Sequence, residues 1–213
     1  MNFFDKIFGR KKTVQTFFLK DELTEEEKQI CKTAQLPESD GLLLKKLTQQ
    51  AIIAVAFEQE YTKAVKPIAI GSITSESMSK KIVLENLEFF KQLGKYIFVF
   101  GLAESGYIVA ITGATNNPYT LMEYAETNGA NYGIETEDII AKLKKWDNEF
   151  GIIPVGIGFD FCECHIKNTN IDFKKLAMEV YEFCPDVVDQ GTETVEALEE
   201  EIKESGTIYL WWD

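Results

Sequence analysis

The chain ends in a strongly apolar segment. Its last five residues are Tyr209-Leu210-Trp211-Trp212-Asp213. Two adjacent tryptophans are unfavourable in water, so we expect this segment to be a strand inside the fold rather than a free tail. Because side chains alternate along a strand, Trp211 and Trp212 should point to opposite faces. At least one of the two is therefore expected to be buried.

Patterns typical of strands and of helices alternate along the chain. The clearest is a hairpin, because the β-rich runs 96–101 and 107–112 are separated by a few turn-forming residues. A capping box that begins a helix is expected at Thr24 and Glu27, and Thr136 is a residue type favoured at the N-cap of the helix that follows it. The apolar run 51–57 fits either a buried strand or a continuing helix. Further strands are expected at 68–73, 152–159, 161–167 and 208–212, and helices at 24–31, 41–50, 79–93, 136–150, 172–184 and 194–204.

This alternation predicts an α+β fold in which helices pack on a largely antiparallel sheet. With 213 residues, 45% of them hydrophobic, the chain is long enough to bury a core without disulfides. It has no internal repeat and no long linker rich in Pro, Gly or Ser, so we expect a single compact domain. Within it we distinguish a basic leader at 1–20, an N-terminal part at 21–106 and a C-terminal module at 107–213.

The charge of the chain is uneven. The formal net charge is −13. Residues 1–20 hold five lysines or arginines and one aspartate, a net charge of +4, so the rest of the chain carries −17. An acidic body repels phosphate backbones, so we expect no nucleic-acid binding and, as a partner, a basic protein. Glutamates dominate the outer face of the helix expected at 194–204, which is either a docking surface or simply a solvated face.

The beginning of the leader is amphipathic. Apolar side chains share one helical face and a basic triplet follows them: Phe3, Phe4, Ile7, Phe8 and Arg10-Lys11-Lys12. This pattern resembles an interfacial membrane anchor, but a helix of about two turns is marginal on its own. We therefore expect residues 1–12 to dock on their own domain or to fray rather than to bind a membrane. The chain shows no signal-peptide pattern, and its four cysteines are expected to be reduced in a cytoplasm.

Several segments of the second half occur in a specific order and spacing. They are Thr127-Asn128-Gly129-Ala130-Asn131-Tyr132, the helix at 136–146, Gly156-Ile157-Gly158-Phe159-Asp160, the segment 184–191 and the final Trp-Trp-Asp. Together they resemble a bacterial family catalogued as domain of unknown function 4253, over roughly residues 107–213. The resemblance implies a small bacterial α+β module that ends in a buried strand. It implies no reaction, cofactor or catalytic residue.

The candidate binding residues are polar and lie in loops of this half: Thr127, Asn128, Asn131, Asp160, Asp186, Asp189 and Gln190. The first three belong to a glycine-containing loop whose backbone amides could hold an anion. The aspartates could serve acid–base chemistry, but carboxylates at such positions more often cap turns and helix N-termini. We therefore expect capping before catalysis at these positions, and no catalytic residue is assigned.

The cysteines invite two further hypotheses. In Cys162-Glu163-Cys164-His165, alternation along a strand separates the cysteines from Glu163 and His165, so the four side chains do not converge on one ion. We expect no metal there and two buried thiols instead. Cys184 ends a helix, where the dipole raises the pKa of a thiol, so we expect a core thiol rather than a nucleophile.

These patterns favour a binding protein over an enzyme. We expect a cytoplasmic, non-enzymatic module that binds a basic protein through an acidic surface, by analogy with immunity proteins encoded beside toxins. The alternative is an enzyme in which Asp160, Asp186 or Asp189 acts with His165. Such an enzyme needs these groups within hydrogen-bond reach in one cleft. No cofactor is expected, and the sequence predicts no oligomeric state.

Overall fold

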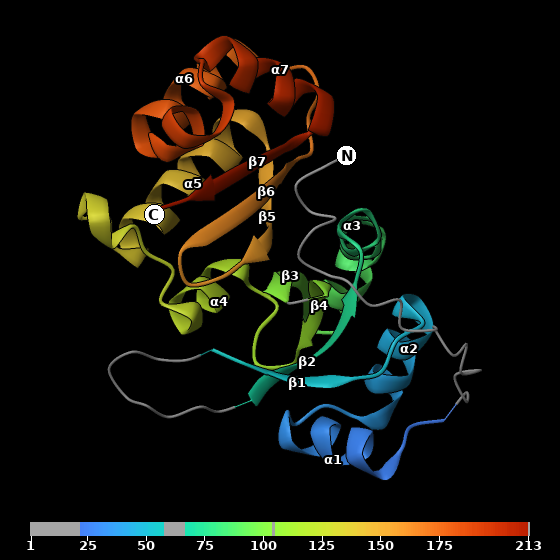
Figure 1. The fold of residues 1–213 in the computed structure, drawn as a ribbon. Helices are drawn as coiled ribbons and strands as arrows, with labels where there is room; N and C mark the ends of the chain where they lie inside the picture. Colours follow the sequence, from blue (N-terminus) through green and yellow to red (C-terminus); the bar gives the residue numbers. More distant parts are fainter. Residues whose placement is uncertain (1–21, 58–66, 104, 213) are drawn as a thin grey trace, which may run out of the picture.

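A computed structural model describes residues 22–57, 67–103 and 105–212, and Figure 1 shows its fold. Its seven strands form one sheet in the order β1-β2-β4-β3-β5-β6-β7. All neighbouring strands in this part of the chain run antiparallel except β3 and β5, which are parallel. The predicted α+β fold with a largely antiparallel sheet is therefore confirmed. The basic leader predicted at 1–20 lies outside the described residues.

The first half contributes the lower part of the molecule in Figure 1. Thr24 begins the first helix as expected, since its hydroxyl accepts from the Glu27 amide and the Glu27 carboxylate accepts from the Thr24 amide. Gln49 ends the second helix in a left-handed conformation, with φ 55°, so the apolar run that follows forms a strand. The elements are α1 (Glu25–Thr33), α2 (Glu38–Thr48), β1 (Ile53–Ala56), β2 (Pro67–Thr74), α3 (Glu76–Gln92), β3 (Tyr96–Ala103) and β4 (Gly106–Thr112).

The second half differs from expectation at two places. The N-cap of α5 is Glu135 rather than the expected Thr136. The Asp138 carboxylate accepts from the Glu135 amide at 3.1 Å, and this hydrogen bond fixes the start of the helix. A π-helical turn, η3, occupies the segment expected to be a loop. The elements are α4 (Pro118–Ala125), η2 (Ala130–Tyr132), α5 (Thr136–Phe150), β5 (Ile152–Ile157), β6 (Phe161–Ile166), α6 (Phe173–Phe183), η3 (Val187–Thr192), α7 (Val195–Ser205) and β7 (Thr207–Trp211).

Helices cover both faces of the sheet. Helix α3 packs on β3 and β4, whereas α4 and α5 pack on β5. Lys80 of α3 forms an ion pair with Glu163 of β6, whereas Cys162 and Cys164, which flank Glu163, act electrostatically on Tyr119 of α4. Since successive side chains of a strand point to opposite faces, α3 and α4 lie on opposite sides of β6. None of the helices in the described ranges is long and apolar enough to cross a membrane.

The C-terminal strand lies at one edge of the sheet. Strand β7 pairs antiparallel with β6, and Trp212 directly after it is 5% exposed. The Trp212 ring packs edge-on against Phe183 at a centroid distance of 6.0 Å, while Trp211 on the other face is partly exposed. The prediction that at least one of the two tryptophans is buried is confirmed.

Candidate functional site

Three segments of the predicted motif meet at the chain end. The Thr127 hydroxyl donates to the Gly158 carbonyl at 2.6 Å, and the Asn128 amide donates to the Phe159 carbonyl at 2.9 Å. The Trp212 amide donates to the Asp160 carbonyl at 3.1 Å. The loop after α4, the turn between β5 and β6, and the end of β7 are thus held together. These bonds give Thr127 and the Asn128 backbone a structural role.

The carboxylates around η3 also accept internal hydrogen bonds. Asp186 is 2% exposed, and its Oδ1 accepts from the Tyr132 hydroxyl at 2.5 Å and from Gln190 Nε2 at 2.8 Å. The hydrogen bond to Asp186 raises the pKa of Tyr132 to about 12. Asp189 accepts from the Tyr181 hydroxyl at 3.2 Å. Asp186 and Asp189 therefore link the η3 segment to η2 and α6, whereas Gln190 bonds back to Asp186 within that segment.

The remaining candidates lie apart from one another. Asn128 Oδ1 accepts from the Ala130 amide at 3.0 Å and closes a local turn, and Asn131 is exposed on η2. Asp160 is exposed just before β6, whereas His165 lies near the other end of that strand. Five strand residues span about 16 Å, so Asp160 and His165 do not share one hydrogen-bonding site. Asp160 nevertheless lines a hollow on the surface of the protein.

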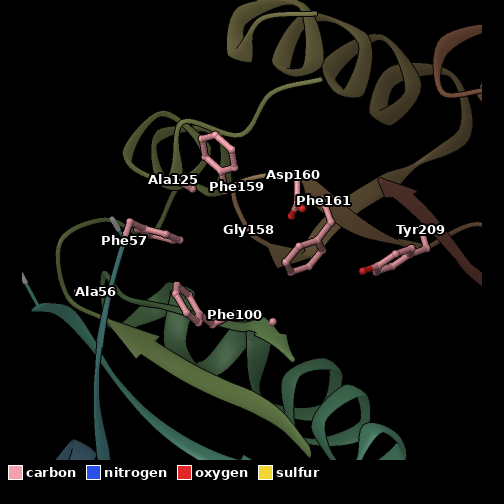
Figure 2. Close-up of a pocket in the computed structure, with 10 residues that line it drawn as sticks. Ala56, Phe57, Phe100, Ala125, Gly158, Phe159, Asp160, Phe161 and Tyr209 are labelled. Atoms are coloured by element: carbon pink, nitrogen blue, oxygen red, sulfur yellow. The ribbon is translucent and has the colours of Figure 1, made fainter. Parts of the chain in front are cut away.

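This aromatic hollow has a volume of about 770 Å³ (Figure 2). Its aromatic rings come from both halves of the chain: those of Phe57 and Phe100 from the first half, and those of Phe159, Phe161 and Tyr209 from the second. Asp160 is the one charged residue among the described residues that line it. The rest of the lining consists of Ala56, Gly101, Ala125 and Gly158.

Glycines make room for the ring of Phe161 beside the aromatic hollow. A Cβ added to Gly158 would lie 2.0 Å from Phe161 Cε1, and one added to Gly101 would lie 3.5 Å from the same atom. Gly101 also has φ +148°, a conformation that side chains rarely adopt. The ladders that involve Gly101 and Gly156 both shift register there, and such bulges re-aim side chains. The hollow is thus shaped by backbone geometry as well as by rings.

A second, charged hollow lies on the α3 side of β6, with a volume of about 460 Å³. We call it the Glu163 cleft, because the buried Glu163 side chain, 4% exposed, lines it. Lys80 Nζ lies 2.9 Å from Glu163 Oε1 and 3.2 Å from Glu76 Oε1. The lining is completed by residues of β4, η3, α7 and β7: Tyr107, Val187, Gly191, Thr192, Leu198, Glu201, Ile202, Ser205, Thr207, Tyr209 and Trp211.

The charges of the Glu163 cleft influence its titratable groups. Partial burial by itself disfavours the Lys80 ammonium, but hydrogen bonds to Glu163 and Glu76 outweigh it and raise the pKa of Lys80. Burial, and next the negative charge of Glu163, raise the pKa of Tyr209 to about 12. The cleft thus presents one ammonium and neutral phenols near neutral pH.

The cysteines lie in the core. Cys162 and Cys164 are fully buried, with their Sγ atoms 3.6 Å apart, and Glu163 points into the cleft on the other face. Across the described ranges, no group of three or more His, Cys, Asp or Glu side chains is placed to hold a metal ion. Burial is the main cause that raises the pKa of Cys184 to about 12. Its thiol donates to the Trp211 carbonyl at 2.9 Å.

The sequence predictions missed most of both hollows. Lys80 and Phe100 carry no local signal of function, because each has the residue type expected on a helix surface or in a strand. The alternation of side chains along β6 and β7 did indicate part of these hollows. Alternation placed Phe161 and Glu163 on the face opposite the cysteines, and Tyr209 joins that face through its pairing with Glu163.

Comparison with known proteins adds a family but no activity. No curated protein and no solved structure matches this chain. The model of a family described as a domain of unknown function, DUF4253, matches residues 109–213, which confirms the resemblance drawn from the motifs. This part holds Glu163, Asp160 and Tyr209, whereas Lys80 and Phe100 precede it. The match to DUF4253 thus covers residues 109–213 and does not extend to the first half of the chain.

Proposed function

We propose that this protein is a non-enzymatic module that binds a basic protein, and that the Glu163 cleft receives an arginine side chain of that partner. The observation that carries the proposal is the buried Glu163 carboxylate in the lining of an open cleft. A carboxylate removed from water is favourable only when cations or hydrogen-bond donors approach it. Lys80 supplies one such cation, and a partner can supply another.

The balance of charge in the cleft favours a cationic ligand. Its charged lining residues are Glu76, Glu163, Glu201 and Lys80, which together carry a net charge of −2 when all are ionised. Lys80 already contacts Glu76 and Glu163. One further positive group near Glu201 would reduce the remaining repulsion among the carboxylates.

The acidic outer face of α7 continues from this cleft. Leu198 and Ile202 are buried on the inner side of α7, and Glu201 lines the cleft. Three further glutamates are exposed on the same helix: Glu196, Glu200 and Glu204. Such a surface attracts a basic protein before contact and raises its association rate, an effect that salt screens.

Arginine fits the cleft better than lysine does. The planar guanidinium offers five N–H donors and pairs with carboxylates through two parallel hydrogen bonds. It also stacks on aromatic rings, and Tyr107 and Tyr209 line the cleft beside Glu163. An arginine side chain can therefore use both the charge and the rings of this site.

The test is a titration followed by backbone amide NMR, with N-acetyl-arginine amide as the probe and N-acetyl-citrulline amide as its uncharged counterpart. We expect the arginine compound to shift the signals of residues 163, 201 and 209, and citrulline to bind at least about tenfold more weakly, as for a lost charged hydrogen bond. Glu201→Gln should weaken arginine binding, whereas Glu200→Gln, next to it on the solvent side, should change it little. Equal binding of the two compounds, or equal effects of the two variants, would reject the arginine site.

The charged face of α7 is tested with a short arginine-rich peptide. Reversal of Glu196, Glu200 and Glu204 to lysine should slow association and flatten its dependence on salt without unfolding the domain. An unchanged association rate would show that this face only solubilises the protein. In a bacterial cytoplasm, a module of this kind would act as immunity proteins do, by covering the basic surface of a toxin. A toxin gene beside this one would support that role.

A further inference from the structure

The aromatic hollow differs from the Glu163 cleft in chemistry. Two ring pairs lie across it from each other in Figure 2: Phe57 with Phe100, whose centroids are 5.1 Å apart, and Phe161 with Tyr209, at 5.7 Å. In the same view the Asp160 carboxylate lies beside Phe161, and the Phe159 ring lies beside Ala125. A pocket enclosed by rings with one carboxylate selects both for shape and for charge.

We propose that the aromatic hollow binds a small organic cation that carries an alkylated ammonium group. The faces of aromatic rings are electrostatically negative and attract such cations, whose methyl groups also bury apolar surface. Asp160 adds a full negative charge, and no lysine or arginine is among the described residues that line the hollow. The same lining disfavours anions such as phosphate esters. Its volume lies in the range typical of small-molecule sites.

The position of the hollow in the fold supports a ligand site. Phe100 and Gly101 lie toward the carboxyl end of β3, and Gly158 to Asp160 follow the carboxyl end of β5. These strands are the parallel pair of the described sheet, joined in register at Val99 and Gly156. In open α/β sheets, ligand crevices form outside the carboxyl ends of the parallel strands. The β-bulges at Gly101 and Gly156 are also features that occur next to binding sites.

The key contacts lie on exposed residues, so variants can be made without loss of the core. Phe159 is 43% exposed and Asp160 is also exposed. Phe159→Leu keeps an apolar side chain but removes the ring, and Asp160→Asn keeps the size but removes the charge. Glu137→Gln removes an exposed carboxylate of α5 outside the hollow and serves as the matched control.

The experiment compares choline with 3,3-dimethyl-1-butanol, in which a carbon replaces the charged nitrogen, by titration monitored through backbone amide NMR. We expect choline to shift the signals of residues 100–101 and 158–161 and to bind at least about fivefold more tightly than the alcohol, the range of a cation–π contact. Asp160→Asn and Phe159→Leu should each weaken choline binding severalfold and leave the alcohol nearly unaffected. Glu137→Gln should leave both unchanged.

Three outcomes would overturn the proposal. Equal affinity for choline and the alcohol would make the hollow an apolar site without charge selectivity. If Asp160→Asn and Glu137→Gln weaken choline binding equally, Asp160 contributes only long-range electrostatic attraction and no direct contact. Choline shifts centred on residues 198, 201 and 207 would place the cation in the Glu163 cleft. Because Glu163→Gln should not alter choline binding in the aromatic hollow, failure of one site can be distinguished from failure of the other.

Discussion

The ammonium of Lys80 lies 2.9 Å from the carboxylate of Glu163, and this ion pair connects the two halves of the chain. Lys80 lies on α3, before the part that matches DUF4253, and Glu163 lies on β6 within it. The Glu163 side chain is 4% exposed and that of Lys80 is 35% exposed. The first half of the chain therefore supplies the counter-ion of a buried carboxylate in the second.

Removal of Lys80 should destabilise the fold because Glu163 would stay buried without its cation. We expect Lys80→Met to lower the free energy of unfolding by about 1.5–3 kcal/mol, as for the loss of a charged hydrogen bond. Glu163→Gln in the same background should recover part of that loss, since it removes the uncompensated charge. Urea denaturation measures both. The matched control is Lys81→Met, whose exposed pair with Glu85 at 3.9 Å should be worth less than about 1 kcal/mol. Equal losses for Lys80→Met and Lys81→Met would refute the role of the pair.

The two terminal tryptophans should differ in their contribution to stability. Trp212→Ala should cost ~3–5 kcal/mol, because a buried ring against Phe183 and Gly129 is lost. Trp211→Ala should cost clearly less, since that ring remains partly exposed. Thermal and urea unfolding of the two variants provide the comparison. If both variants melt like the wild type, the chain end does not pack as the structure indicates.

Acid should weaken the contact between α5 and α6 through Glu179. Its carboxylate accepts from Lys145 Nζ at 2.9 Å and Trp146 Nε1 at 3.0 Å, and the hydrogen bond from Lys145 is the main cause that lowers the pKa of Glu179 to about 2. A lowered carboxyl pKa stabilises the fold above the unfolded value of about 4.5, and this stability is lost as the pH falls toward 2.

We therefore expect Glu179→Gln to reduce the loss of unfolding free energy between pH 5 and pH 2.5, as measured by urea denaturation at several pH values. Glu182→Gln removes an exposed carboxylate of the same helix and should leave this pH dependence almost unchanged. Identical pH profiles for wild type and Glu179→Gln would contradict the prediction.

The thiols should be protected in the native protein. All four cysteines are buried and unpaired: Cys31, Cys162, Cys164 and Cys184. Burial raises the pKa of Cys184 to about 12, so little thiolate exists at pH 8. With Ellman's reagent at that pH, we expect the native protein to react roughly 100-fold more slowly than the unfolded protein, because reaction requires opening of the structure. Rapid labelling of Cys184 alone would instead identify it as a reactive thiol.

Local patterns predicted most elements correctly, but they missed a turn that depends on a residue distant in sequence. Thr24 and Glu27 form their capping box because both partners lie within one turn, so sequence spacing suffices to predict it. The π-helical turn at 187–192 was missed. It is held partly by the bond from Gln190 to Asp186 and by Tyr132, which is distant in sequence.

For the candidate residues too, the sequence indicated the residue type and only the fold supplied the partner. Thr127, Asp186 and Asp189 were recognised as polar loop residues, and the structure gives each a hydrogen-bond partner. For Thr127 and for the Tyr132–Asp186 bond, these partners lie more than 30 residues away in sequence. Asp160 lines the aromatic hollow, and its position there with rings from the first half has no counterpart in local sequence.

By itself, the sequence determined most of the helices and strands, the acidic charge of the chain outside residues 1–20 and the resemblance of the second half to DUF4253. These properties depend on neighbouring residues, on composition and on ordered motifs. Only the tertiary structure decided that Lys80 faces Glu163 and that Phe57 and Phe161 line one hollow. Such pairings depend on strand order, register and bulges, which many weak contacts determine together rather than any single pattern along the chain.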